Sequence, residues 1–459
     1  YEALEKFKSV KSGTYLCPLR LLALEAFESL TEKKLPVSLI TGELVQKTEG
    51  AEHVASTIEM VDFEKPVKMA IIDEVQMLAD PDRGSAWTHA ILGVPADEVW
   101  MLGAPEAEAA VVHLASILGE PLEIVRKERL SPFDVEKTHT ALNRIPPKSA
   151  VVAFSRKKVL EIAAELRTRY KREVSVVYGA LSPEVRREQA RKFREGETEV
   201  VVATDAIGMG LNLPIQSMFF SDFKKWNGSE LKDLDPHLTW QIAGRAGRYG
   251  ISEHGKVSAL DPHTLRAIQV QLSKRPDEIP TAYSYHPTLP LVKVLSHHLQ
   301  TEDLEEIFNF FQKQLKLSSQ PEFLPRFSEE QLLLAHEIHG LSLSLQQKLM
   351  LTQAPVPLNQ KNPTPFFLEF SRSLSRGKPI RLAGYRFLCH RGKDMDLDEA
   401  ELNVKILTLY SWLHYREPEF FPDFEQVQQE ISLLNQNILN MLQKSAEKKC
   451  KTCGKILSW

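Results

Sequence analysis

Residues 202–214 read VATDAIGMGLNLP, and residues 241–250 read QIAGRAGRYG. In the second segment, Arg245 and Arg248 lie three residues apart in a glycine-rich frame behind Gln241. Guanidinium groups are always charged and fork onto phosphate oxygens, so a pair held at a helix start could reach a phosphate chain across a cleft. An arginine in that role can raise phosphoryl-transfer rates by roughly 10³–10⁵. Two solvated arginines at a glycine-loosened helix start are the alternative, and the block at 202–214 argues against it.

Apolar runs around these segments predict a parallel sheet covered on both faces. Between the runs, the helix over 183–194 has Ser182 as its expected N-cap and Pro183 at its first position. A similar alternation occupies the start of the chain, where residues 13–30 predict a strand, a turn at Pro18 and a helix. The expected strands are 67–75, 98–106, 149–155, 174–179 and 199–207, and the other expected helices include 1–10 and 156–170.

The fold class is therefore α/β in two tandem sheets, with a change of character near residue 263. Beyond it, leucine-rich helical periodicity with few strand candidates predicts an all-α region. The expected domains are 1–127 and 147–262, joined by a polar connection at 128–146, then helices over 263–445 and a short tail at 446–459.

Composition excludes several classes of protein. The 459 residues are 43% hydrophobic, and no apolar run approaches the roughly 20 residues that a membrane helix needs. Four cysteines make no disulfide framework. Because the net charge is −4, contacts with nucleic acid require local basic patches. Such patches are Lys224 with Lys225 and a helix carrying Arg186, Arg187, Arg191, Lys192 and Arg194.

The segment Asp73-Glu74-Val75-Gln76 ends a predicted buried strand. Carboxylates at the carboxyl edge of a parallel strand lie where open α/β sheets bind ligands. Asp73 there can hold Mg²⁺ through water, and Glu74 can orient or deprotonate an attacking water. An acidic pair that only caps the next helix is the alternative.

A loop that cradles phosphates, Gly-x-x-x-x-Gly-Lys-Ser/Thr, is not present in a usable form. The near match at 250–257 has Val257 where a hydroxyl is needed, and no apolar strand precedes it. The residues after Gly255 predict a strand rather than a helix. If residues 1–10 are the helix that follows such a loop, the loop lies before Tyr1.

Four turns predict contacts with a nucleic-acid backbone, because amides at helix starts and Thr hydroxyls bind phosphates. We expect strand-to-helix turns at Pro18-Leu19-Arg20, Thr41-Gly42-Glu43, Thr57-Ile58-Glu59-Met60 and Thr204-Asp205. Together the four turns fit a single-strand track over both domains.

Cys450 and Cys453 form a Cys-x-x-Cys-Gly knuckle near the end of the sequence. A structural Zn²⁺ site needs four ligands, so these two thiols predict half a site whose partners lie beyond Trp459. Zn²⁺ is expected only with such further residues.

Together these motifs resemble superfamily-two helicases with RecA-like domains. The segments PLRLLALEAFE, TIEM, AIIDEVQMLADPDRGSAWTHAILG, VYGALSPEVRREQARKF and HPTLP more closely resemble the Suv-type ATP-dependent RNA helicases of the mitochondrial degradosome and their bacterial relatives. LSLSLQQKLMLTQAPVPL and ILTLYSWLHYR resemble the helical end of that family. The resemblance covers about residues 1–440.

The resemblance implies a role for each matching residue. It implies Mg²⁺ and water activation for Asp73 and Glu74, and contact with the γ-phosphate of ATP for Gln241, Arg245 and Arg248. Asp205 and Gly210 would couple nucleotide to RNA, and we place Gln76 and Gly244 at the nucleotide as well. The implied contacts with the RNA backbone are Pro18, Arg20, Thr41, Gly42, Thr57, Ser155 and Thr204.

The family further implies 3′-to-5′ unwinding of RNA together with an exoribonuclease such as polynucleotide phosphorylase, and no membrane. This chain departs from it by lacking the phosphate-binding loop and the first strand of the first sheet, so we expect deficient ATP hydrolysis. Some ten to thirty residues upstream of Tyr1 would restore it. A non-catalytic RNA-binding fragment, a DNA helicase and a protein-translocating motor are the alternatives. The Cys-x-x-Cys-Gly tail and the lack of a presequence favour a bacterial cytoplasm over mitochondria.

Overall fold

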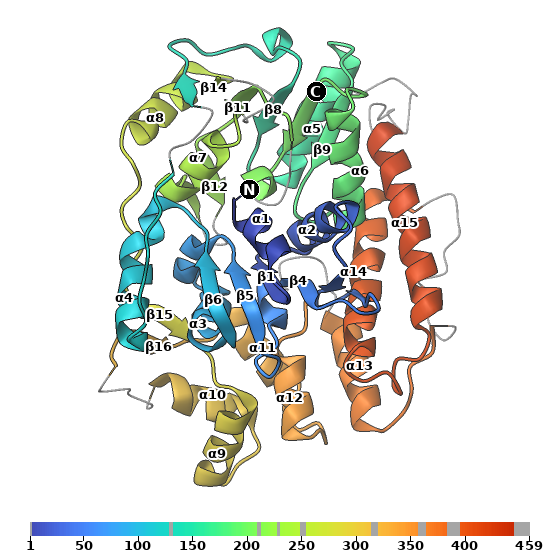
Figure 1. Cartoon of the computed structure of the whole chain (residues 1–459). Coiled ribbons are helices and arrows are strands. Elements are labelled where there is room, and N and C mark those ends of the chain that lie inside the picture. Colours follow the sequence, from blue (N-terminus) through green and yellow to red (C-terminus); the bar gives the residue numbers. More distant parts are fainter. Residues whose placement is uncertain are drawn as a thin grey trace. The chain divides into compact units, whose positions relative to one another are not determined.

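The computed structural model describes residues 2–127, 132–208, 213–226, 230–247, 254–313, 320–356, 364–382 and 395–444. The chain divides into two compact units, each with a six-stranded sheet (Figure 1). Unit 1 comprises residues 1–124 and 278–432, and unit 2 comprises residues 125–277 and 433–459. The predicted pair of α/β sheets is therefore confirmed, whereas the predicted domain boundaries and the missing first strand stay predictions.

The sheet of unit 1 has the strand order β3-β2-β4-β1-β5-β6. All neighbours are parallel except β2 and β3. The expected strands at 13–17, 67–75 and 98–106 are present, whereas the short strands β2, β3 and β4 were not predicted. The bounds are β1 Gly13–Cys17, β2 Val37–Ile40, β3 Val45–Gln46, β4 His53–Thr57, β5 Val67–Ile72 and β6 Ala96–Met101.

Helices cover both faces of this sheet. Because side chains alternate along a strand, Ile71 packs on one face with Phe7 and Phe27, and Ile72 packs on the other with Trp87 and Leu114. The first face belongs to α1 (Glu2–Ser9) and α2 (Arg20–Glu32), and the second to α3 (Gly84–Gly93) and α4 (Glu108–Leu118). Both faces are therefore closed to solvent, which leaves the carboxyl ends of the strands as the place for a site.

Unit 2 contains a fully parallel sheet in the order β7-β14-β11-β8-β10-β9. Its central strands β8, β10 and β11 are buried along their whole length. The valine-rich runs of β8 and β10 predict this, whereas β11, with the sequence Ser-Met-Phe-Phe, was not predicted. Ser182 caps α6 by accepting a hydrogen bond from the Val185 amide at 3.3 Å, with Pro183 next to it, as expected. The strands are β7 Phe133–Val135, β8 Ser149–Val152, β9 Val174–Val177, β10 Val200–Ala203, β11 Ser217–Phe220 and β14 Gly255–Ala259, and the helices are α5 Arg156–Thr168, α6 Pro183–Arg194, α7 Pro236–Ala243 and α8 Pro262–Leu272.

Two features of unit 2 differ from the sequence expectation. Residues 133–135 were expected to be a polar connection, but they form β7 because β14 offers them a parallel edge. Strands β12 (Lys224–Trp226) and β13 (Leu231–Asp233) form an antiparallel pair. Both segments are short and polar, so the sequence pattern did not predict them as strands. The partner of β7 is distant in sequence, whereas the partner of β12 is the next strand along the chain.

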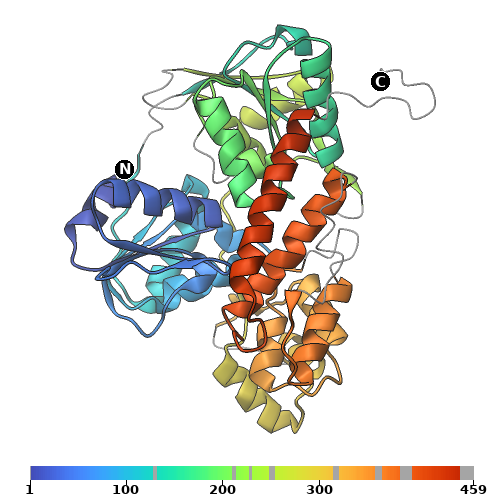
Figure 2. The ribbon, with the colours of Figure 1, turned by 90° about the vertical axis from the view of Figure 1, so that its right-hand side faces the viewer.

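The C-terminal region is helical, as predicted, apart from a parallel pair of three-residue strands, β15 (Tyr283–Tyr285) and β16 (Phe323–Pro325). This pair belongs to the core of unit 1 on the side of α3. Helix α14 and the first part of α15 lie side by side (Figure 2), where the Gln428 amide donates to the Ser411 hydroxyl at 2.9 Å. The helices are α9 Leu289–Leu299, α10 Leu304–Lys313, α11 Glu329–Glu337, α12 Leu345–Leu351, α13 Thr364–Ser375, α14 Leu397–His414 and α15 Phe424–Lys444.

Candidate functional site

The predicted acidic pair follows the carboxyl end of β5. The Asp73 amide donates to the Leu16 carbonyl of β1 at 2.9 Å, and the Val75 amide donates to the Leu102 carbonyl after β6 at 2.9 Å. Between them Glu74 adopts a left-handed backbone, with φ of 55°. A non-glycine residue in this region is strained and persists only where its surroundings impose it. The sheet therefore holds both carboxylates at its ligand-binding edge.

Asp73 is held by three groups. The Tyr15 hydroxyl donates to Asp73 Oδ2 at 2.6 Å, the Glu74 amide donates to Oδ1 at 3.0 Å, and the Trp87 indole donates to the Asp73 carbonyl at 2.9 Å. Burial and the negative charge of Asp73 raise the pKa of Tyr15, so its hydroxyl stays a donor at neutral pH. Sequence reasoning missed Tyr15 and Trp87, because they come from β1 and α3 rather than from the motif.

Gln76 connects Glu74 to the loop after β6. Its side-chain nitrogen donates to the Glu74 carboxylate, and its side-chain oxygen accepts from the Ala104 amide at 3.1 Å. A Cβ on Gly103 would lie 2.8 Å from that oxygen and 2.6 Å from Val75 Cγ2, so only glycine fits there. A shift of the Gly103–Ala104 loop would therefore move Gln76 and, through it, the Glu74 carboxylate. The sequence alone does not predict this connection.

Unit 2 brings two of its predicted residues, Gln241 and Arg245, together at Gly208. The Arg245 guanidinium donates through Nε to the Gly208 carbonyl at 2.9 Å and also through Nη2. A Cβ on Gly208 would lie 3.4 Å from Gln241 Oε1, so the side chains of Gln241 and Arg245 both lie close to Gly208. Gly208 ends the short 3₁₀ helix Asp205–Gly208, whose Asp205 is paired with Lys225 at 2.5 Å.

The local setting of Arg245 corrects one expectation. The helix α7 ends at Ala243 with Gly244 as its C-cap, so Arg245 follows the end of a helix and does not lie at its start. Gly247 then turns the chain with φ of +67°, and a Cβ on it would come 2.4 Å from the Gly255 nitrogen. The glycines of this motif therefore serve a tight turn against β14. The predicted residues Gly210 and Arg248 lie outside the described residues.

The predicted RNA-contacting residues of unit 1 follow the ends of β1, β2 and β4. Pro18 is buried, and its carbonyl accepts from Arg83 Nη2 at 2.6 Å. That guanidinium also pairs with Glu59 at 2.6 Å and thus links the turns after β1 and β4. Thr57 precedes the 3₁₀ helix Ile58–Met60, and Arg20 begins α2 without a side-chain cap at its N-terminus. Arg83 was missed because nothing in its own segment marks it.

The Thr41-Gly42-Glu43 segment was expected to be a strand-to-helix turn. It is instead the turn between the antiparallel strands β2 and β3. Thr41 is 1% exposed, and its hydroxyl accepts from the Leu44 amide at 3.0 Å. Two strands this short are joined by a tight turn, which leaves no residues for a helix. Thr41 therefore shapes the turn, and Gly42 and Glu43 form its more accessible part.

The candidates of unit 2 use their hydroxyls locally. Ser155 follows β8 and caps α5 by accepting from the Lys158 amide at 3.1 Å. Thr204 follows the neighbouring strand β10 and accepts from the Ala206 amide at 3.3 Å. The basic helix α6 is less basic than its composition indicates, since Arg191 is paired with Glu188 at 2.8 Å and Glu197 at 2.7 Å.

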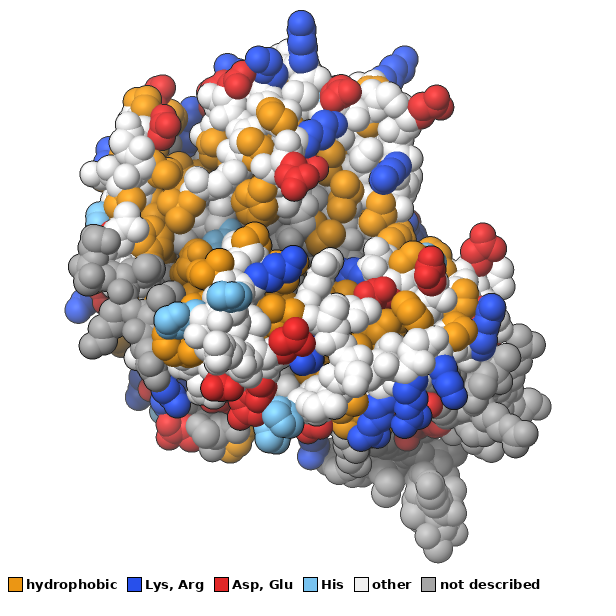
Figure 3. Space-filling view, turned by 90° about the horizontal axis from the view of Figure 1, so that it is seen from below, with side chains coloured by type: hydrophobic (Ala, Val, Ile, Leu, Met, Phe, Trp, Pro, Cys, Tyr) orange, Lys and Arg blue, Asp and Glu red, His pale blue; other side chains and the backbone are white. Residues whose placement is uncertain are grey.

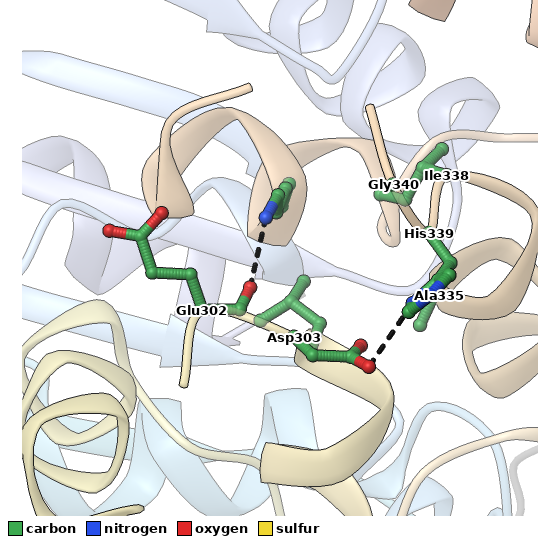
Figure 4. Close-up of a pocket in the computed structure, with 8 residues that line it drawn as sticks. Glu302, Asp303, Ala335, Ile338, His339 and Gly340 are labelled. Carbon is green, nitrogen blue, oxygen red and sulfur yellow. Dashed lines mark hydrogen bonds and ion pairs between the residues drawn. The ribbon is translucent and has the colours of Figure 1, made fainter. Parts of the chain in front are cut away.

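A small pocket of about 180 Å³ lies apart from these residues, in the helical part of unit 1. Figure 4 shows the His339 ring directed at the Asp303 carboxylate, with 3.1 Å between Nδ1 and Oδ2. Lys348 Nζ donates to the Glu302 carbonyl at 3.0 Å. On the face shown in Figure 3, acidic and histidine side chains adjoin. These contacts join α12 and the ends of α10 and α11, which indicates a packing role.

Two kinds of feature are absent from the described residues. Within them, no group of three or more His, Cys, Asp or Glu side chains is arranged to hold a metal ion, and no helix is both long and apolar enough to cross a membrane. The predicted half of a Zn²⁺ site, Cys450 with Cys453, lies outside the described residues.

Three segments of the chain match known families. Residues 1–127 match the DEXQ-box helicase domain of Suv3, residues 135–250 match the helicase conserved C-terminal domain, and residues 397–444 match the C-terminal domain of the ATP-dependent RNA helicase SUV3. The first match contains Asp73 and Glu74, and the second contains Arg245.

Curated relatives extend the match over most of the chain. The DExH-box ATP-dependent RNA helicase DExH16 of Arabidopsis thaliana is 35% identical over 443 residues, which cover 95% of this chain and 77% of that protein. The SUV3 homolog of Drosophila melanogaster is 34% identical over 444 residues, 92% of this chain and 57% of the relative. Human SUPV3L1 is 34% identical over 441 residues, which cover 92% of this chain and 56% of that protein. The chain thus spans under three fifths of the length of the last two.

The names of these relatives correct one expectation and complete the assignment. All of them, and those from zebrafish, rice and Candida albicans, are called mitochondrial, so the expectation of a bacterial cytoplasmic protein is wrong. A cysteine pair and the residues at the start of a sequence are weak indicators of compartment. Since the segment with the acidic motif and the helical end both match SUV3 models, and a relative 35% identical is covered over 77% of its length, this chain belongs to the SUV3 family of ATP-dependent RNA helicases.

Proposed function

We propose that this chain is the motor portion of an RNA helicase that uses ATP and Mg²⁺ and moves 3′-to-5′ along a single-stranded RNA tail. The observation that carries the proposal is the Asp73–Glu74–Gln76 group, which β1, α3 and the loop after β6 hold at the ligand-binding edge of a parallel sheet. The matches to SUV3 helicase domains support it, and the direction of movement is carried over from the family resemblance.

Asp73 suits Mg²⁺ held through water. Both carboxylate oxygens accept hydrogen bonds from the protein, which fixes the orientation of the group, and an ionised carboxylate is an oxygen ligand of the kind that hydrated Mg²⁺ binds. Bound Mg²⁺ would neutralise charge on the phosphates of ATP. Glu74 would accept the proton of the attacking water, while Gln241, Arg245 and Arg248 would bind the γ-phosphate.

RNA would follow the turns after β1, β2 and β4 in unit 1 and those after β8 and β10 in unit 2. The backbone amides at the uncapped start of α2, near Arg20, support a phosphate contact there. Contacts of this kind carry no base readout, so binding would be sequence-tolerant and salt-dependent.

We further propose that these 459 residues by themselves hydrolyse ATP poorly. In the near match to a phosphate-binding loop, the position that needs a Mg²⁺-binding hydroxyl is Val257, and it lies inside β14 rather than at a helix start. This observation favours a second candidate function, an RNA-binding protein without turnover. The relatives' names also support a mitochondrial location, and the family resemblance supports an exoribonuclease such as polynucleotide phosphorylase as a partner.

The test measures phosphate release and unwinding together. For the 459 residues we expect binding of single-stranded RNA without measurable hydrolysis. A chain extended upstream of Tyr1 by a segment with the Gly-Lys-Thr loop should hydrolyse ATP when RNA is added and unwind a duplex with a 3′ tail, not a 5′ tail. In that chain Arg248→Ala should abolish hydrolysis and keep RNA binding, whereas the exposed Arg266→Ala in α8 should change neither.

Three outcomes would contradict parts of the proposal. Steady hydrolysis by the 459 residues would refute the predicted deficiency. Unwinding of DNA as fast as RNA would favour the DNA-helicase alternative. Near-normal hydrolysis by Arg248→Ala would remove that arginine from the catalytic group.

A further inference from the structure

The carboxyl end of α14 packs on the turn between β2 and β3, which contains the predicted RNA-contacting residue Gly42. Both elements belong to unit 1, although more than 350 residues separate them in sequence. Three side chains make the contacts: Trp412 in the last turn of α14, its C-cap Tyr415, and Arg416 in the turn that follows. A segment of the SUV3 C-terminal domain thus touches a turn of the DEXQ-box domain.

Arg416 is the centre of this contact. Its Nη1 donates to the Gly42 carbonyl at 3.1 Å and to the Trp412 carbonyl at 2.9 Å, while Nη2 lies 3.8 Å from Met60 Sδ. The guanidinium stacks on the Trp412 ring with 3.6 Å from Cζ to the ring centre. Its hydrogen-bonding fork therefore reaches both the turn after β2 and the segment after β4.

Trp412 and Tyr415 fix the same turn from two further directions. Trp412 is 5% exposed, and a Cβ added to Gly42 would lie 3.3 Å from its Cδ1 atom. The Tyr415 hydroxyl accepts from the Val45 amide at 3.2 Å. With the Thr41 hydroxyl on the Leu44 amide, both ends and the middle of the turn are held.

The charged guanidinium of Arg416 is partly buried in this contact. Burial lowers the pKa of Arg416 to about 10, and Glu43 opposes that shift, so the guanidinium is still charged at neutral pH. Glu43 is itself paired with Arg20 at 3.1 Å. A guanidinium already bonded to two carbonyls and stacked on an indole is arranged to hold the protein backbone rather than to bind a phosphate.

We propose that Trp412, Tyr415 and Arg416 are positioning residues that hold the Thr41–Val45 turn in the shape that binds the phosphate backbone of single-stranded RNA. The inference rests on the proposed function, because it takes the Gly42 turn as an RNA contact. It makes the C-terminal region part of the RNA site without a direct contact to RNA. Without these side chains the turn would gain freedom, and RNA would have to order it on binding.

The experiment measures the affinity of the 459-residue chain for a fluorescein-labelled single-stranded oligouridylate by anisotropy at several salt concentrations. Tyr415→Phe removes only the acceptor for the Val45 amide, so we expect about fivefold weaker binding, the equivalent of one hydrogen bond of about 1 kcal/mol. Arg416→Gln removes the fork and should weaken binding tenfold or more. The matched control is Arg372→Gln on α13, an exposed arginine of the same unit, which should bind as the parent does.

The dependence of affinity on salt separates positioning from contact. Each lost phosphate contact lowers the slope of log affinity against log salt by about 0.7 for a single strand. We expect parallel slopes for the parent, Tyr415→Phe and Arg416→Gln. A smaller slope for Arg416→Gln would show a direct phosphate contact and overturn the positioning role.

Folding and the proposed function are tested separately. The circular dichroism spectrum of each variant at the assay temperature must match that of the parent. Because Tyr415→Phe keeps the aromatic ring, this variant still tests the inference if Arg416→Gln does not fold. Equal affinity of a folded Tyr415→Phe and the parent would refute the inference. A parent chain that does not bind RNA at all would instead refute the proposed function.

Discussion

Replacing Tyr15 by Phe deletes one oxygen atom and leaves the fold of β1 otherwise intact. The ring is 7% exposed, and its hydroxyl lies 2.6 Å from Asp73 Oδ2, so the lost bond is a buried one to a charged group. Such bonds contribute about 1.5–3 kcal/mol, since the stranded carboxylate cannot recover water in the same place. We expect the opening free energy of β5 to fall by about 2 kcal/mol.

Hydrogen exchange followed by mass spectrometry measures this opening free energy directly for peptides that span β5. A loss of about 2 kcal/mol corresponds to exchange about 30-fold faster. In an Asp73→Asn background the same Tyr15→Phe change should cost only about 1 kcal/mol, because the acceptor is then neutral. The control is Tyr170→Phe, whose hydroxyl makes a local 3.3 Å bond to Glu165 in unit 2 and should leave β5 unchanged. Exchange of β5 within twofold of the parent in Tyr15→Phe would refute the reasoning.

Two further predictions concern a glycine turn and a buried histidine. Gly247→Ala, at φ of +67° with a Cβ 2.4 Å from the Gly255 nitrogen, should cost more than about 3 kcal/mol in a melting experiment. Gly196→Ala, at φ of +79° with open space around the added Cβ, should cost only about 1 kcal/mol of unfolding free energy, and equal losses for the two variants would contradict the steric argument.

Burial and the neighbouring His89 lower the pKa of His286 to about 4 in the folded chain. As pH falls below 6.5, His286 is therefore protonated in the unfolded chain before it is protonated in the folded one. Unit 1 should therefore lose about 2 kcal/mol between pH 7 and pH 5, and His286→Asn should lose measurably less in urea titrations at both pH values.

Long apolar runs made most of both sheets predictable. The strands near 67, 149, 174 and 200 are rich in Val, Ile and Ala, and such short apolar segments flanked by turn residues are typical of buried strands. Ser182 and Pro183 predicted the start of α6 because capping is a local interaction. The short strands β2, β7 and β12 escaped prediction, since only their partners make them strands.

Motif spacing placed Asp73, Glu74 and Arg245 in sequence but not always in structure. Glycines around Arg245 were interpreted as a helix start, whereas Gly247 serves a turn against β14 after a helix has ended. The pattern around Thr41 was likewise taken for a helix start, but the turn joins two paired strands. Glycine and threonine occur in both settings, and the local sequence does not distinguish them.

The sequence by itself determined the two sheets, the helical C-terminal region and the identity of the acidic and arginine motifs, because these depend on periodicity and local chemistry. The tertiary structure alone decided which groups hold those motifs. Tyr15 reaches Asp73 because β1 and β5 pair in parallel with Tyr15 opposite Ile71, and Arg416 reaches Gly42 because α14 packs beside the β2–β3 turn. Contacts between residues 58 and 374 positions apart are set by strand register and helix packing, and neither leaves a mark in the local sequence.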